Sequence, residues 1–219
     1  MTEGRTLLTC GEHAVLVEVA GLEEVLALAQ AVREAVAAGS AGFTDIVDIV
    51  PAARTVLVVV RNDAPMGLVR QALSTLPDAQ PAELPSGETL EVPVHYDGPD
   101  LGEVARLTGL SVAGVIAAHT GTEWKVAFGG FAPGFAYLTG GDPRLEVPRR
   151  SEPRTVVPSG SVALAGEFSA IYPRSSPGGW QLIGRTDIAM FTPDRQPPAL
   201  LHAGAVVRFV DVSGARHGG

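Results

Sequence analysis

The spacing of apolar residues changes near the middle of the chain, and this change predicts two parts with different structures. In the first part, apolar residues alternate over some segments and recur every third or fourth residue over others. These patterns predict short strands and amphipathic helices, respectively. The five predicted elements are strand, helix, strand, strand and helix, at residues 14–20, 21–39, 43–51, 55–60 and 65–76.

This order of elements predicts an α+β domain at residues 1–84. A strand, a helix, two further strands and a second helix are typical of a ferredoxin-like split βαβ layer, with the helices on one side of a small sheet. Residues 77–88 contain three prolines, a glycine and acidic residues without periodicity, which indicates a linker. We therefore expect the boundary between two domains in this segment.

The second part begins with a strand, two helices and another strand, predicted at residues 90–96, 100–108, 111–119 and 124–131. Asp100 and Ser111 are expected to cap the two helices. Beyond residue 131, many short apolar segments are separated by Gly and Pro turns, a pattern of mainly-β barrels and sandwiches. The second domain is therefore placed at residues 89–212, and the polar residues 213–219 are predicted to form a flexible tail.

Composition excludes several classes of function. The chain has 219 residues, a formal charge of −8 and a single lysine, so it lacks the distributed positive charge that binds nucleic acid. Its one cysteine, Cys10, allows no internal disulfide, and no apolar run approaches the length of a membrane span. We therefore expect a cytoplasmic protein without nucleic-acid or membrane partners.

Several common catalytic motifs are missing. No G-x-x-x-x-G-K-[ST] run is present, so a phosphate-binding loop of the P-loop type is not expected. The five histidines lack the spacing of a metal site, and no metal is expected. Ser159 and Ser161 do not lie in a G-x-S-x-G motif, so they are interpreted as residues that bond turn backbone.

Glycine and proline are concentrated between Gly129 and Thr186, where the chain reads FGGFAPGFAYL and, later, IYPRSSPGGWQLIGRT. Aromatic and β-branched residues are interspersed among them, which predicts folded turns around a cleft rather than disorder. Phe131, Tyr137 and Trp180 have two interpretations, as core residues or as rigid walls for a small ring.

Four arginines lie between residues 144 and 154 of this acidic chain, and they create a local positive field suited to a carboxylate or phosphate. Arg144 and Arg150 are interpreted as solvated surface residues near Glu146 and Glu152. The other two, at positions 149 and 154, lie beside prolines that stiffen the backbone. They are candidates for contacting an anionic substrate or a partner chain.

His119 is the candidate for proton transfer. It ends the second predicted helix of this domain, and a helix C terminus favours the charged form of a histidine. General-acid catalysis and simple capping of the last carbonyl groups both remain open.

Four long motifs carry a resemblance to a known family: GFAPGFAYL, the run VPRRSEPRTVVPSGSVALAG, IYPRSSPGGWQLIGRT and PPALLHAGAVVRF. Together they resemble the allophanate hydrolase subunit 1 (KipI) family, and within it the members that are components of ATP-dependent 5-oxoprolinase. The close match runs from about residue 90 to residue 210. The resemblance implies a cyclophilin-like barrel for the second domain.

The resemblance also implies an activity and partners. Members of this kind cleave 5-oxo-L-proline to L-glutamate with ATP hydrolysis, together with two other 5-oxoprolinase subunits, the homologous C subunit and the separate A subunit. The ATP site would lie on this chain or on a partner. Two alternatives remain: a binding module that inhibits a sensor histidine kinase, and a carboxyltransferase or amidohydrolase that acts on urea or allophanate.

Under this interpretation, His119 and Arg154 are the predicted catalytic residues. The predicted substrate-binding residues come from the Gly- and Pro-rich turns and their flanks, and they are Phe131, Pro133, Gly134, Tyr137, Arg149, Gly160, Ser161, Pro177, Gly178, Gly179, Trp180 and Arg185.

Overall fold

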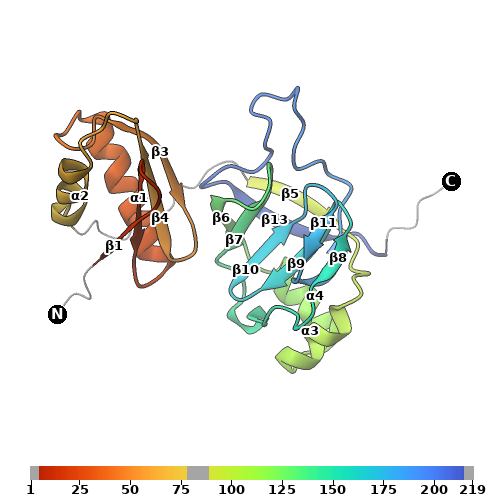
Figure 1. Cartoon of the computed structure of the whole chain (residues 1–219). Coiled ribbons are helices and arrows are strands. Elements are labelled where there is room, and N and C mark those ends of the chain that lie inside the picture. The colour runs from red at the N-terminus through yellow and green to blue at the C-terminus, as the bar shows by residue number, and fades with distance from the viewer. Residues whose placement is uncertain (1–4, 78–88, 215–219) are drawn as a thin grey trace. The chain divides into compact units, whose positions relative to one another are not determined.

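The computed structural model describes residues 5–77 and 89–214. The chain divides into two compact units, Met1–Glu83 and Leu84–Gly219. Most of the predicted linker, residues 78–88, and the end of the predicted tail, residues 215–219, lie outside the described residues (Figure 1).

The first unit contains the five predicted elements and one more strand. In chain order they are β1 (Thr6–Thr9), β2 (Ala14–Glu18), α1 (Leu22–Ala37), β3 (Ile46–Pro51), β4 (Thr55–Val60) and α2 (Met66–Thr75). The sheet order is β1-β2-β4-β3, and every neighbouring pair is antiparallel. Because β4 lies between β2 and β3, the predicted split βαβ arrangement is confirmed. β1 was not predicted, because its four residues are mostly exposed and show no apolar alternation.

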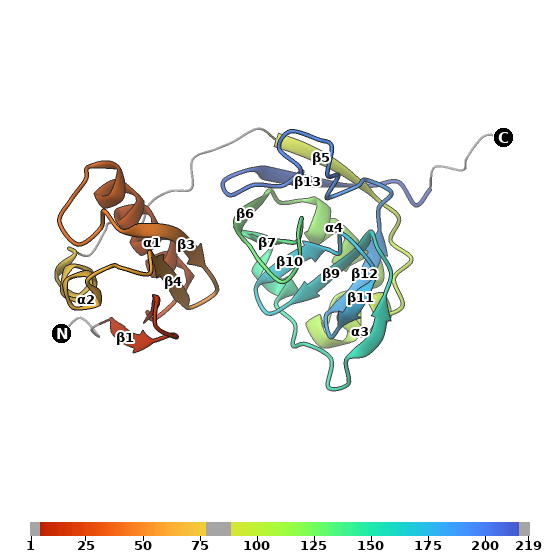
Figure 2. The same ribbon diagram turned by 45° about the horizontal axis from the view of Figure 1, so that its top comes forward.

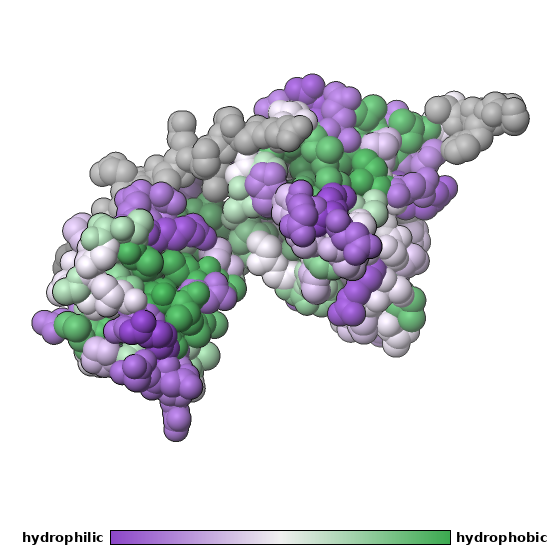
Figure 3. Space-filling model, turned by 90° about the horizontal axis from the view of Figure 1, so that it is seen from above, coloured by the Kyte–Doolittle hydropathy of each residue, from purple (hydrophilic) through white to green (hydrophobic). Residues whose placement is uncertain are grey.

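Both helices of this unit pack on one face of its sheet. The shared core combines alternate valines of β2 and β4 with the apolar stripes of the helices: Val15, Val17, Val56, Val58, Val25, Leu28, Val32, Val69 and Leu73. The unit also exposes apolar side chains, including Leu8 and Val47. Hydrophobic residues form a green area on the face of this unit seen in Figure 3.

The second unit is a β-barrel. Its seven-stranded sheet has the order β12-β9-β10-β7-β6-β13-β5. The strands are β5 (Thr89–Val94), β6 (Trp124–Gly129), β7 (Ala136–Thr139), β9 (Ser161–Ala165), β10 (Phe168–Ile171), β12 (Gln181–Arg185) and β13 (Val206–Asp211). The two edges meet, because the backbone N–H groups of His95 and Arg185 each donate to the other's carbonyl at 2.9 Å. The expectation of a mainly-β barrel is thus confirmed (Figure 2).

Helices α3 (Leu101–Thr108) and α4 (Val112–Thr120) contribute Leu101, Val104 and Val115 to the barrel interior. Ser111 caps α4 as predicted, since its Oγ accepts a 3.0 Å hydrogen bond from the N–H of Gly114. Among the described residues, no single helix is long and apolar enough to cross a membrane. The pair α3 and α4 passes that test only jointly, and a 90° bend separates them.

Alternate residues of the barrel strands build two separate cores. On β9, Val162 and Leu164 belong to the interior, whereas Ala163 and Ala165 face the other side of the sheet. That outer side is covered by a short ribbon of β8 (Arg154–Val157) and β11 (Ser176–Gly178), and by the turn that follows β6. The outer core contains two of the predicted site residues, Tyr137 and Trp180.

Candidate functional site

Aromatic rings from distant segments meet on the outer side of the barrel. We call the five residues Phe131, Phe135, Tyr137, Tyr172 and Trp180 the aromatic face. Their rings pack edge to face, with centroids 5.2 Å apart for Phe131 and Phe135, 5.7 Å for Phe135 and Trp180, and 5.6 Å for Tyr137 and Trp180. Small alanines on β9 and β10 lie within the same cluster. The structure therefore brings together the three aromatic residues that the sequence singled out.

The turn between β6 and β7 holds Phe131 in an unusual conformation. Its φ is +66°, and it is the only non-glycine residue with positive φ in the described part of the chain. The ring is nonetheless 60% exposed. Gly134, after Pro133, has a φ of +80°, and a Cβ there would lie 2.6 Å from Cβ of Phe191. A left-handed backbone under an exposed aromatic ring is costly, and such strain is concentrated at functional sites.

We predict that Phe131→Gly changes the free energy of unfolding by less than about 1 kcal/mol. Glycine relieves the positive-φ strain but adds entropy to the unfolded chain, and the exposed ring contributes little packing. Urea denaturation of the variant would measure this, with the buried neighbour as comparison: Phe135→Ala should cost about 3–5 kcal/mol. A comparable loss for Phe131→Gly would show that its ring is part of the core.

A buried carboxylate organises two of the predicted arginines. Asp100 is 3% exposed, and its Oδ1 accepts hydrogen bonds from Arg150 Nη1 at 2.8 Å and from Arg154 Nη2 at 2.7 Å. Its Oδ2 accepts the N–H of Leu182 at 2.7 Å. Burial alone would raise the pKa of Asp100, but the hydrogen bonds from Arg154 and Leu182, with both guanidinium charges, lower it.

Three sequence interpretations need correction here. Arg150 is partly buried and pairs with Asp100, and it contacts Glu152 only through a 3.3 Å hydrogen bond from its Nε to the backbone carbonyl. Arg144 is on the surface as expected, but its partner is Asp142. Asp100 precedes α3 as predicted, yet its side chain makes no capping hydrogen bond. It contacts arginines far along the chain, which its local sequence could not reveal.

Arg149 lies beside the aromatic face without a fixed partner. It is exposed, and no salt bridge joins it to a described residue. Its Nε is 4.0 Å from the position that a Cβ would take at Gly179. Its charge also opposes the rise in the pKa that burial causes for both Tyr137 and Tyr172. The guanidinium therefore acts electrostatically on both phenols, and no described residue engages it in a salt bridge.

Two glycines among the predicted site residues lie where a side chain does not fit. A Cβ at Gly178, which follows Pro177 in β11, would lie 2.4 Å from the hydroxyl of Tyr172. Gly160 has a φ of +79°, and a Cβ there would lie 2.2 Å from the carbonyl oxygen of Thr186. A side chain at Gly160 would require the backbone to move, and one at Gly178 would displace the ring of Tyr172.

Two further predicted site residues have structural partners. Ser161 Oγ donates to the carbonyl of Pro158 at 2.8 Å, which is the turn contact expected of such serines. Arg185 pairs with Asp97 at 2.9 Å, next to the backbone seam that closes the barrel.

Some buried polar atoms of the second unit have no hydrogen-bond partner. Among the described residues, three buried side-chain atoms have no hydrogen bond: Arg154 Nη1, Ser176 Oγ and Gln181 Oε1. They belong to β8, β11 and β12, respectively. Unsatisfied buried groups are uncommon in folded proteins, and a bound ligand or water is one explanation for them.

His119 is part of the barrel interior and not of the aromatic face. Its side chain is fully buried, its Nδ1 lies 2.7 Å from the Tyr96 hydroxyl, and its Nε2 lies 3.0 Å from Ser169 Oγ. It also stacks on Phe209, with centroids 4.2 Å apart. Burial lowers the pKa of His119 to about 3. The expectation that the helix C terminus favours its charged form is therefore wrong, because desolvation outweighs the helix dipole.

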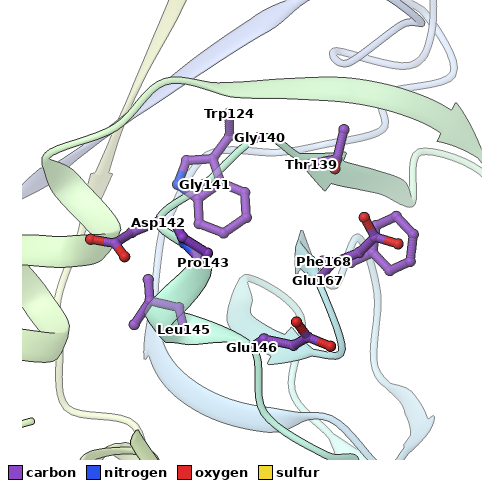
Figure 4. Close-up of a pocket in the computed structure, with 10 residues that line it drawn as sticks. All are labelled: Trp124, Thr139, Gly140, Gly141, Asp142, Pro143, Leu145, Glu146, Glu167 and Phe168. Atoms are coloured by element: carbon purple, nitrogen blue, oxygen red, sulfur yellow. The ribbon is translucent and has the colours of Figure 1, made fainter. Parts of the chain in front are cut away.

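A cavity of about 310 Å³ lies elsewhere on the barrel, and none of the predicted site residues lines it. The rings of Trp124 and Phe168 and the side chains of Glu146 and Glu167 surround it (Figure 4). In the described part of the chain, no group of three or more His, Cys, Asp or Glu side chains could hold a metal ion.

Comparison with known proteins gives a consistent result. The family described as "Carboxyltransferase domain, subdomain C and D" matches residues 5–201. The B subunit of 5-oxoprolinase from Escherichia coli O157:H7 is 40% identical over 207 residues, which cover 91% of this chain and 93% of that protein. The protein of the same name from Bacillus subtilis (strain 168) is 50% identical over 127 residues, and this match spans 57% of this chain and about half, 53%, of the relative.

Among solved structures, TTHA0988 superposes with a TM-score of 0.72 at 35% identity. The match covers 90% of this chain but only 39% of TTHA0988. A protein of this kind can therefore form one part of a longer polypeptide.

Proposed function

The chain belongs to the family of the carboxyltransferase domain, subdomains C and D, and from this membership we propose that it is one component of an ATP-dependent 5-oxoprolinase. The enzyme would hydrolyse 5-oxo-L-proline to L-glutamate in the cytoplasm. The similarity to proteins named as the B subunit of 5-oxoprolinase supports this proposal.

The observation that carries the proposal is Arg149 beside the aromatic face. The substrate is a flat five-membered lactam with one carboxylate. Rigid rings suit the faces of such a molecule, and a guanidinium without an internal partner suits its charge. Arg154, held by Asp100, adds positive charge near Tyr172. Under the proposal, these two arginines bind the carboxylate of the substrate or a phosphate.

The reaction needs parts that this chain does not supply in a recognisable form. The lactam amide is a poor electrophile, and phosphorylation of its oxygen by ATP would make attack by water feasible. That step requires a phosphate site, and the sequence contains no phosphate-binding loop of the P-loop type. We therefore place the ATP site on a partner or between chains, with the homologous C subunit and the separate A subunit of 5-oxoprolinase as the partners.

Reconstitution tests this proposal. We expect glutamate release from 5-oxoproline and ATP when this chain is combined with the A and C subunits, and no release when this chain is omitted. Urea and allophanate, offered in parallel, should not be consumed. Activity that survives omission of this chain, or turnover of urea or allophanate in place of 5-oxoproline, would contradict the proposal.

A further inference from the structure

The proposed reaction needs a hydrogen-bond donor, and the interior position of His119 removes the donor expected from the sequence. The amide oxygen is the proposed acceptor of the phosphoryl group, and a hydrogen bond from a positioned N–H or O–H group to its second lone pair would orient it for that transfer. His119 is fully buried with both ring nitrogens engaged. The donor must therefore come from another residue, and the aromatic face carries two phenols.

Tyr172 is poorly placed for this role. It is 2% exposed, and its hydroxyl lies where a Cβ at Gly178 would approach to 2.4 Å. The backbone of Trp180 also acts on this hydroxyl and opposes the rise in its pKa that burial causes. A group so enclosed supports the local structure instead of meeting a ligand.

Tyr137 differs from Tyr172 in both respects. It is partly exposed, and no hydrogen bond or ion pair joins its hydroxyl to a described residue. Its ring is nevertheless well fixed, since it stacks on Phe128 with centroids 4.4 Å apart and meets Phe135 edge to face at 5.1 Å. A rigid ring with an unengaged O–H is preorganised to donate.

The positive charge of Arg149 suits the carboxylate of the proposed substrate. Burial raises the pKa of Tyr137, and the nearby Arg149 partly opposes this rise. The phenol therefore keeps its proton at neutral pH. Arg149 Nε is 4.0 Å from the position of a Cβ at Gly179, and the next residue, Trp180, packs on Tyr137 with centroids 5.6 Å apart. A neutral donor and a positive charge on the same face fit a small ligand that carries an amide oxygen and a carboxylate.

We propose that the Tyr137 hydroxyl donates a hydrogen bond to the amide oxygen of a small anionic lactam whose carboxylate is bound by Arg149. This inference rests on the proposed function and assigns the donor role to a residue that the sequence suggested only as an aromatic wall.

Tyr137→Phe tests the donor role, because it removes the hydroxyl and keeps the ring. In the complex with the A and C subunits, we expect kcat for 5-oxoproline to fall about 10²-fold, because the amide oxygen is no longer held in position. The melting temperature should not change, since the hydroxyl has no partner among the described residues. Tyr96→Phe is the matched control: it removes a phenol oxygen bonded to His119 in the interior, so it should lower the melting temperature without a comparable loss of kcat.

Two ligands distinguish the hydrogen bond of Tyr137 from the ion pair of Arg149. Cyclopentanecarboxylate resembles 5-oxoproline but has no amide. Calorimetry should show that Tyr137→Phe weakens binding of 5-oxoproline about 5-fold, the value of one hydrogen bond. Binding of cyclopentanecarboxylate should stay unchanged.

The failure of this inference can be distinguished from failure of the proposed function. If the wild-type complex hydrolyses 5-oxoproline and Tyr137→Phe keeps its kcat and its affinity, the donor role is refuted and the proposed function stands. If the wild-type complex neither binds nor hydrolyses 5-oxoproline, both are refuted. Equal weakening of the two ligands would also refute the donor role, because it would indicate a general disturbance of the aromatic face.

Discussion

Arg149→Met is expected to lower kcat/KM for 5-oxoproline by about 10- to 100-fold, with no change in the melting temperature. A hydrogen bond to a charged group contributes about 1.5–3 kcal/mol, and the proposal gives Arg149 the carboxylate of the substrate. The folded chain loses little, because Arg149 is exposed and forms no salt bridge with a described residue. Steady-state glutamate release by the reconstituted complex and thermal unfolding of the variant are the two measurements.

Arg106→Met is a suitable control for this experiment. Arg106 is an exposed arginine on α3, and it pairs with Glu103 on the same helix. Its replacement should leave kcat/KM unchanged. If Arg149→Met retained the wild-type kcat/KM, the aromatic face would not be the site of the carboxylate.

Arg154→Ala would distinguish a role in substrate binding from a role in folding less clearly than Arg149→Met. Its guanidinium binds the buried Asp100, and truncation would leave that carboxylate with one fewer compensating charge. Stability and activity should then fall together. The structure therefore favours Arg149 as the position that separates a role in binding from a role in folding.

Acid is expected to destabilise the barrel through His119. Burial lowers its pKa from 6.5 to about 3, so the unfolded chain binds a proton in this range that the folded chain does not bind. The free energy of unfolding therefore falls as the pH decreases from 6.5 towards 3, by up to about 1.4 kcal/mol per pH unit from this residue. Above pH 6.5 the imidazole is neutral in both states, and this contribution is fully present.

His119→Gln provides the comparison, because an amide can hydrogen-bond but does not titrate. We expect this variant to be less stable than the wild type near neutral pH, since it loses the stacking on Phe209. Its stability should also depend less steeply on pH. Urea denaturation of both proteins at several pH values would measure the slopes, and equal slopes would mean that His119 is not the group responsible.

Local patterns were sufficient for five of the six elements of the first unit. The valines of β4 and the helical spacing of α1 identify these elements without tertiary information. β1 is different, because it is a short edge strand whose conformation depends on pairing with β2. Barrel closure likewise joins segments that are distant in the sequence, so no local pattern indicates the contact between His95 and Arg185.

In the candidate site, too, the sequence predicted local features but not contacts between distant residues. The Gly- and Pro-rich turns predicted the position of Phe131 and Trp180, because strained backbone leaves a compositional signal. The partner of Arg154 is 54 residues earlier in the chain, so its pairing with Asp100 could not be read from neighbouring charges. Burial of His119 was equally hidden, since helix position alone does not show which face of α4 enters the barrel.

The parallel pair of β5 and β13 has a consequence for how the barrel is made in the cell. Thr89 pairs with Val206 and Val94 with Asp211, so the first strand of the barrel cannot pair until the last has been made. During synthesis, a ribosome must release nearly the whole domain before Val207 and Phe209 can fill the interior. Folding of this unit is therefore completed only after translation of its C-terminal strand, and a chain truncated before residue 206 would expose its core to chaperones and proteases.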